Sequence, residues 1–150
     1  MIEAALFTVG VFQDVAWAEK GLQALRAGGF APDILSFVAK DSLDAAALGE
    51  RTFGTEVPTI EIRGLGTARA RGPIVDALQG ADRALGSKGV AATVSRIGFQ
   101  PHDGRIFEAL IDRGGILVAI LSEARAADAL AILHSYGGGN AAIGAWGGRV

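Results

Sequence analysis

The residues best suited to chemistry lie in one short segment, Pro101-His102-Asp103-Gly104-Arg105. Because proline is tolerated at the first position of a helix, this segment predicts a helix start. A histidine, a carboxylate and a guanidinium there can bind an anion with help from the free amides of the first turn. We therefore take His102, Asp103 and Arg105 as candidate ligand-binding residues. The alternative is an ordinary helix cap, in which Asp103 accepts from first-turn amides while His102 and Arg105 are solvated.

A second polar segment runs from His134 to Asn140 and contains three consecutive glycines, Gly137 to Gly139. A glycine-rich loop that cradles phosphate leads from a strand into a helix. This segment has the opposite polarity, because it follows a predicted helix and enters a predicted strand. It is typical of a helix C-terminus, with Gly137 as the cap and His134 favoured by the helix dipole.

Few residues predict catalysis or metal binding. His102 and Asp103 are adjacent and have no second histidine nearby, which makes a poor metal site. Glu108 and Asp112 lie four residues apart, a spacing more typical of a solvated helix face than of paired catalytic carboxylates. Cysteine is absent, and no serine has a Gly-x-Ser-x-Gly context. We expect no catalytic residue, metal or cofactor. An enzyme would require His102 or His134 in a deep pocket with a carboxylate within hydrogen-bond reach.

Composition and charge limit the classes of partner and the cellular location that we expect. The chain of 150 residues fits one domain spanning residues 1–150, and its net charge of −2 disfavours nucleic-acid binding. The arginines at 63, 69 and 71 alternate with small residues, which is typical of the wet face of a strand. No run approaches the ~18 apolar residues that a membrane span needs. The start carries no secretory signal pattern, and the absence of cysteine fits a reducing compartment, so we expect a cytoplasmic protein.

The two ends of the chain resemble each other. A strand, a helix, a pair of glycines and another strand occupy about residues 3–39, and the same order returns at about residues 115–148. Val9 corresponds to Val118, and after a one-residue slip Leu25 corresponds to Leu133. Two such β-α-β units predict an α+β fold with a ferredoxin-like sheet, a duplicated unit whose helices cover one face.

The middle, about residues 40–114, is an insertion between the copies. Lys40–Thr55 is polar and is predicted to be a mobile loop with a short helical turn after Ser42 at most. Alternation in Val57–Arg63 predicts a half-buried strand with Ile60 and Ile62 inward. Thr67–Arg71 is expected to continue the same edge.

Helical patterns fill the rest of the insertion. Pro73 opens a helix whose apolar stripe is Ile74, Leu78, Ala81 and Leu85, and a short helix follows Ser87. A further helix begins at Pro101. Because a ferredoxin-like sheet does not need these helices, we expect them on the remaining sheet face, over an edge, or against a second subunit.

Several segments resemble the bacterial general-stress-protein-17M-like (heat-induced stress protein) family. They are residues 11–30 (VFQDVAWAEKGLQALRAGGF), Gly64-Leu-Gly66, Gly72-Pro73 and residues 105–118 (RIFEALIDRGGILV). The Gly/Ala-rich middle typical of such proteins is short here and is interrupted by Asp82, Arg83 and Lys88. The resemblance implies a cytoplasmic, stress-associated protein of undefined biochemistry, and it supplies no catalytic residue.

These observations give three hypotheses for function. The first is a non-enzymatic, stress-associated interaction module that self-associates as a homo-oligomer, because the insertion has apolar helices in excess. The alternative is a small-ligand sensor built on His102, Asp103 and Arg105. The third is a small enzyme using His102 or His134.

Overall fold

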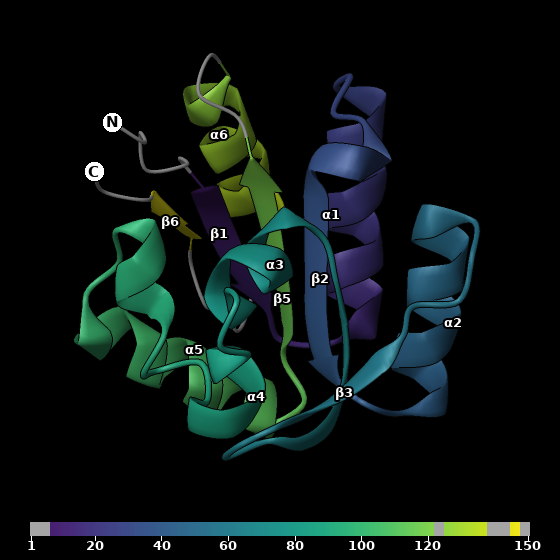
Figure 1. The fold of residues 1–150 in the computed structure, drawn as a ribbon. Helices are drawn as coiled ribbons and strands as arrows, with labels where there is room; N and C mark the ends of the chain where they lie inside the picture. Colours follow the sequence, from purple (N-terminus) through teal and green to yellow (C-terminus); the bar gives the residue numbers. More distant parts are fainter. Residues whose placement is uncertain (1–6, 122–124, 138–144, 148–150) are drawn as a thin grey trace.

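The computed structural model describes residues 7–121, 125–137 and 145–147, which form a six-stranded sheet with helices against it (Figure 1). The strand order is β3-β4-β2-β5-β1-β6, and every neighbouring pair is antiparallel. The strands are β1 (Phe7–Phe12), β2 (Leu35–Lys40), β3 (Thr59–Ile62), β4 (Gly66–Arg71), β5 (Ile116–Leu121) and β6 (Ala145–Gly147). The predicted α+β class is confirmed.

Helices cover both faces of this sheet. The apolar side chains form two separate clusters, one on each face. The first face carries α1 (Val15–Ala27), α2 (Leu43–Phe53) and α6 (Ala126–Gly137). The second carries α3 (Pro73–Gln79), α4 (Ala84–Lys88) and α5 (Pro101–Asp112), with two 3₁₀ turns, η1 (Pro32–Ile34) before β2 and η2 (Val94–Ile97) before α5. This arrangement explains why the central strands are apolar on both sides: all six residues of β1 are buried.

The first strand, helix and second strand follow the sequence prediction closely. Asp14 caps α1, since its Oδ1 accepts from the Trp17 amide at 2.9 Å. Ala18, Leu22 and Leu25 form the buried face of α1. Leu25 packs in the same cluster as Leu133 of α6, so these two helices share one layer.

The prediction of a mobile loop at Lys40–Thr55 is wrong, because most of this segment is α2. Ser42 caps the helix, its Oγ accepting from the Ala45 amide at 3.0 Å, and Gly54 ends it with a φ of 75°. The helix packs on the sheet through a face made largely of small residues: Ala45, Leu48, Gly49 and Thr52. These four residues follow helical spacing, but Leu48 is the one large apolar side chain among them, so apolar residue type did not mark the helix.

The expected continuation of one edge strand is also wrong. Residues 66–71 are a separate strand, β4, which turns back on β3 and lies between β3 and β2. Gly64 and Gly66 have φ values of 90° and 81°, which only glycine adopts without strain, so the break in the alternation is a hairpin turn.

The helices of the insertion are shorter than the apolar stripe suggested. Gly80 ends α3 with a φ of 59°, so Ala81 is exposed rather than part of one stripe with Leu85. A 3₁₀ turn, η2, replaces the helix expected after Ser87. Of the three places considered for these helices, they take the remaining sheet face. None of the described helices combines the length and apolar character needed to cross a membrane.

Candidate functional site

The three residues predicted from sequence lie at the start of α5, and we call His102, Asp103 and Arg105 the α5 cluster. Gln100 is the N-cap, and Asp103 Oδ2 accepts from the Gln100 amide at 3.1 Å, which is the return bond of a capping box. His102 and Arg105 are exposed. The geometry is that of a helix cap, and ligand binding by the cluster stays a prediction.

Gly104 explains why this helix start is so closely packed. A Cβ added there would lie 2.6 Å from Val94 Cγ2 and 2.8 Å from Ala91 Cα. The glycine therefore lets α5 approach the turn before it, a packing role that needs no ligand.

The remaining sequence candidates do not come together with the α5 cluster. Glu108 is half-buried and accepts from the Ala91 amide at 3.4 Å, while Asp112 pairs with Lys40 at 3.1 Å. They therefore serve two different structural contacts. His134 belongs to α6, but its side chain lies outside the described part of the chain.

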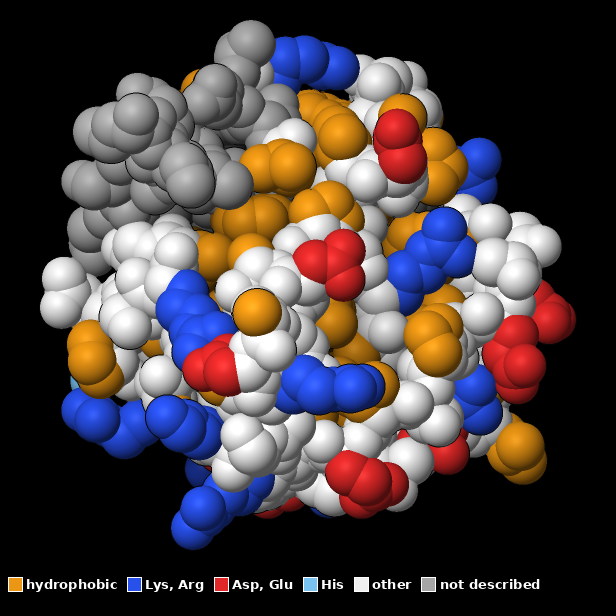
Figure 2. Space-filling model, viewed as in Figure 1, with side chains coloured by type: hydrophobic (Ala, Val, Ile, Leu, Met, Phe, Trp, Pro, Cys, Tyr) orange, Lys and Arg blue, Asp and Glu red, His pale blue; other side chains and the backbone are white. Residues whose placement is uncertain are grey.

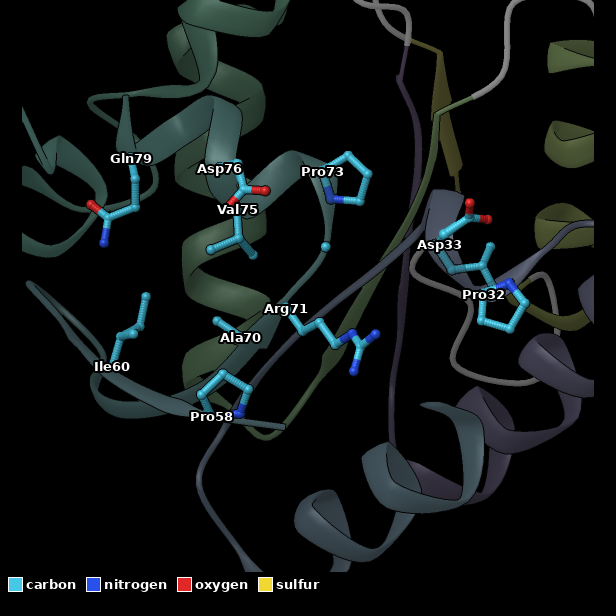
Figure 3. A pocket seen from close by; sticks show the side chains of 12 residues that line it. Pro32, Asp33, Pro58, Ile60, Ala70, Arg71, Pro73, Val75, Asp76 and Gln79 are labelled. Carbon is cyan, nitrogen blue, oxygen red and sulfur yellow. The ribbon is translucent and has the colours of Figure 1, made fainter. Parts of the chain in front are cut away.

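A larger concave feature lies elsewhere, where β4 ends and α3 begins. This β4–α3 cleft has a volume of about 590 Å³ and is open to solvent (Figure 3). Its size is within the range of about 300–1,000 Å³ usual for small-molecule sites. It is lined by residues from η1, β2, β3, β4 and α3: Pro32, Asp33, Leu35, Pro58, Ile60, Ala70, Arg71, Gly72, Pro73, Val75, Asp76 and Gln79.

Rigid and apolar groups form most of this lining. Three proline rings come from three different segments, so they add shape with little side-chain entropy to lose. Ile60 and Val75 face the cleft from β3 and α3 (Figure 3). A ligand with an apolar part could bury it against this wall.

Arg71 is the cationic group of the cleft. It is half-buried at the end of β4, and its guanidinium carbon lies 4.6 Å from the ring centroid of Phe53. Across the described residues its side chain has no ion pair or hydrogen bond. Figure 3 shows it reaching toward Pro32 and Asp33. A guanidinium held by an aromatic face, with its five N–H donors unused, is suited to bind an anionic group.

Two carboxylates and an amide complete the polar lining. Asp33 in η1 and Asp76 in α3 are exposed, and neither side chain has a cationic partner within the described residues. The Oε1 of Gln79 already accepts from the Gly86 amide at 3.2 Å. The charged groups of the lining without a polar partner among the described residues are therefore one cation and two anions.

Sequence reasoning missed this site because it grouped Arg71 with Arg63 and Arg69 as the wet face of a strand. The available signal was position: Arg71 is followed directly by Gly72-Pro73. That pair ends the strand and turns the chain, so the last arginine lies at the sheet's end.

A smaller groove of about 180 Å³ lies between α1 and α2. Its arginines are already engaged: Arg51 pairs with Glu19 at 3.0 Å, and Arg26 donates to the Thr52 carbonyl at 3.2 Å. The groove therefore offers fewer free polar groups than the β4–α3 cleft.

The face of the molecule seen in Figure 2 has no single dominant charge among its described residues. On the face seen in Figure 2, acidic and basic side chains are interspersed, with apolar groups between them. Among the described residues, no three His, Cys, Asp or Glu side chains are grouped so that they could hold a metal ion.

Comparisons with known proteins add no identification. No protein-family model, no curated protein and no solved structure matches this chain.

Proposed function

We propose that this protein binds a small molecule in the β4–α3 cleft and acts as a ligand-binding module. One observation carries the proposal: Arg71 lines a cleft of about 590 Å³ with no polar partner in the described part of the chain. A half-buried guanidinium normally has hydrogen-bond partners, so an anionic ligand group is the natural complement.

The cleft supports ligand binding better than the α5 cluster does. Asp103 already serves the helix cap, and His102 and Arg105 are exposed without lining either of the two cavities described above. Arg71, by contrast, lies in a concave site with apolar walls. The sensor hypothesis is therefore retained, with Arg71 in place of the α5 cluster.

The excess of apolar helices that motivated the homo-oligomer hypothesis is accounted for within one chain. The extra helices α3, α4 and α5 bury their apolar residues on the second sheet face, within the same chain. Leu43, with 91% of its surface accessible, is the exposed large hydrophobic residue found among those the structure describes. Self-association and stress association remain predictions with no structural support of their own.

The scaffold itself supports the proposed duplication. The strands of the two predicted units alternate in the order β6-β1-β5-β2, and α1 and α6 lie on the same face. This order supports the predicted ferredoxin-like sheet. We infer that β3, β4 and α2 to α5 were added to it, which places Arg71 in the unrepeated part, while Pro32, Asp33 and Leu35 of the cleft lining belong to the first unit.

A thermal-shift screen with amino acids, nucleotides and sugar phosphates tests the function. ¹H–¹⁵N NMR spectra with any hit should show shifts concentrated at residues 70–76. Arg71→Ala should abolish the response, while Arg105→Ala, the same change in the α5 cluster, should leave it intact. The reverse pattern would return the site to the α5 cluster, and a silent screen would count against ligand binding.

A further inference from the structure

The edge of β4 beside the cleft carries backbone groups that β3 does not use. The pairing of β3 with β4 begins at Thr59 opposite Arg69, and beyond it the Ala70 amide donates to the Pro58 carbonyl at 3.1 Å. In an antiparallel ladder the opposite residue would return an N–H to the Ala70 carbonyl. Pro58 has no N–H, so that carbonyl has no ladder partner.

Gly72 offers the complementary donor on the same edge. Backbone groups two residues apart point to the same side of an extended strand, so the Gly72 N–H faces the side of the Ala70 carbonyl. No hydrogen bond of the Gly72 amide occurs among the described residues, whereas its carbonyl accepts from Val75 and Asp76. A free acceptor and a free donor thus lie two residues apart where the cleft opens.

This spacing matches one amino-acid unit. A residue lying parallel to a strand donates its N–H to the carbonyl of residue i and accepts at its C=O from the amide of residue i+2. Here these are the Ala70 carbonyl and the Gly72 amide. The carboxylate of an amino acid bound in this way would lie beside the strand segment that carries Arg71.

The charges of the cleft distinguish a free amino acid from other acids. Arg71 complements a carboxylate, while Asp33 and Asp76 complement an ammonium group. A simple anion would leave both carboxylates facing it unpaired. A zwitterionic ligand has a carboxylate for Arg71 and an ammonium group for the aspartates.

Building on the proposed function, we propose that the ligand bound in the β4–α3 cleft is a free α-amino acid with a large apolar side chain. Its carboxylate binds Arg71 and the Gly72 amide, and its ammonium group binds the Ala70 carbonyl in a cleft that Asp33 and Asp76 also line. Its side chain packs on the wall formed by Ile60 and Val75.

Calorimetric titration of the full chain with four related probes tests this assignment. L-Phenylalanine carries both charges, 3-phenylpropanoate lacks the ammonium group, 2-phenylethylamine lacks the carboxylate, and N-acetyl-L-phenylalanine mimics a peptide C-terminus. L-Phenylalanine should bind at least about tenfold more tightly than each of the other three. N-acetyl-L-phenylalanine binding equally well would overturn the zwitterion and favour a peptide terminus.

Variants separate the two charge contacts. Arg71→Gln should weaken L-phenylalanine binding at least about tenfold, and so should the double variant Asp33→Asn/Asp76→Asn. Both aspartates are exposed, so the double variant should fold, and Arg113→Gln, at the exposed residue directly after α5, is the matched control with unchanged affinity. Unchanged affinity in the double variant would overturn the ammonium contact.

The outcomes also separate this inference from the proposed function. If no amino acid binds but another compound binds in an Arg71-dependent manner, the ligand class is wrong and the site stands. If nothing in the screen binds, both fail.

Discussion

Arg69 and Arg71 lie two residues apart on the same side of β4, yet their surroundings differ completely. Arg69 is only 16% exposed and donates to Asp41 at 2.7 Å, to the Val57 carbonyl at 2.8 Å and to Glu56 at 3.4 Å. The hydrogen bond to Asp41 raises the pKa of Arg69 above its ordinary value. Arg71 has the Phe53 ring and no polar partner in the described residues. The fold thus uses one arginine to fix the end of β4 and leaves the next one available.

The opposite wall of the cleft, formed by α3, is also held in place by hydrogen bonds from an arginine. Arg96 in η2 donates to the carbonyls of Leu78 and Gln79, at 3.3 and 3.2 Å, and forms two hydrogen bonds with Asp82. These bonds hold the C-terminus of α3. Arg69 and Arg96, which each have several hydrogen-bond partners, therefore hold the walls of the cleft. Arg71, which has no polar partner among the described residues, lies inside it. The presence of hydrogen-bond partners, rather than residue type or spacing, distinguishes a structural arginine from one that is a candidate for ligand binding.

The largest expected effect comes from Gly72→Ala, which would displace the turn after Arg71. Gly72 has a φ of 113°, and an added Cβ would lie 2.5 Å from the Leu35 carbonyl oxygen and the Ser36 Cα. Because both obstacles are backbone, neither can move aside, and we expect a loss of more than about 3 kcal/mol in the free energy of unfolding, measured in urea.

Gly66→Ala is the matched control for that variant. Gly66 also has a positive φ, 81°, but an added Cβ meets nothing within 4 Å. Only the backbone strain should appear, about 1–2 kcal/mol. Equal losses in the two variants would mean that Gly72 is not held against β2, and the cleft would lose one wall.

The next effect tests the two arginines directly. Arg69→Ala leaves Asp41 and the Val57 carbonyl without their donor, so it should lower the urea midpoint clearly. Arg71→Ala removes only the contact with Phe53 and should cost about 0.5–1 kcal/mol. Equal losses would show that Arg71 is a structural residue like Arg69, and the proposed site would lose its central feature.

Sequence alone predicted the scaffold better than the site. The first strand–helix–strand segment has a long apolar run and a clear cap at Asp14, so local chemistry specified it. The helix α2 was missed because small residues such as Ala45 and Gly49 form its buried face. Arg71 could not be separated from Arg69 because the difference lies in partners distant in sequence: Asp41 for Arg69, and for Arg71 only the Phe53 ring among the described residues. Only tertiary structure supplies that information.

The smallest expected effect concerns the Arg96–Asp82 pair and depends on pH. Hydrogen bonding to Arg96 lowers the pKa of Asp82 from 3.8 to about 2. A lowered pKa in the folded state means that the pair stabilises the protein above about pH 4, and that this contribution is lost as the pH falls from 4 to 2. Asp82→Asn should therefore flatten the decline of the urea midpoint over this range.

A double-mutant cycle isolates that pair from the other bonds of Arg96. Asp82→Asn, Arg96→Gln and the double variant, unfolded in urea at pH 7 and pH 2, give the coupling between the two side chains. Because both residues are exposed, the coupling at pH 7 should be small, and it should be smaller still at pH 2, where about half of Asp82 is protonated. The bonds to Leu78 and Gln79 are broken by Arg96→Gln in either background, so they cancel in the cycle. No coupling at pH 7 would show that Arg96 holds α3 through the backbone carbonyls alone, and the contrast with Arg71 would then rest on carbonyl contacts rather than on an ion pair.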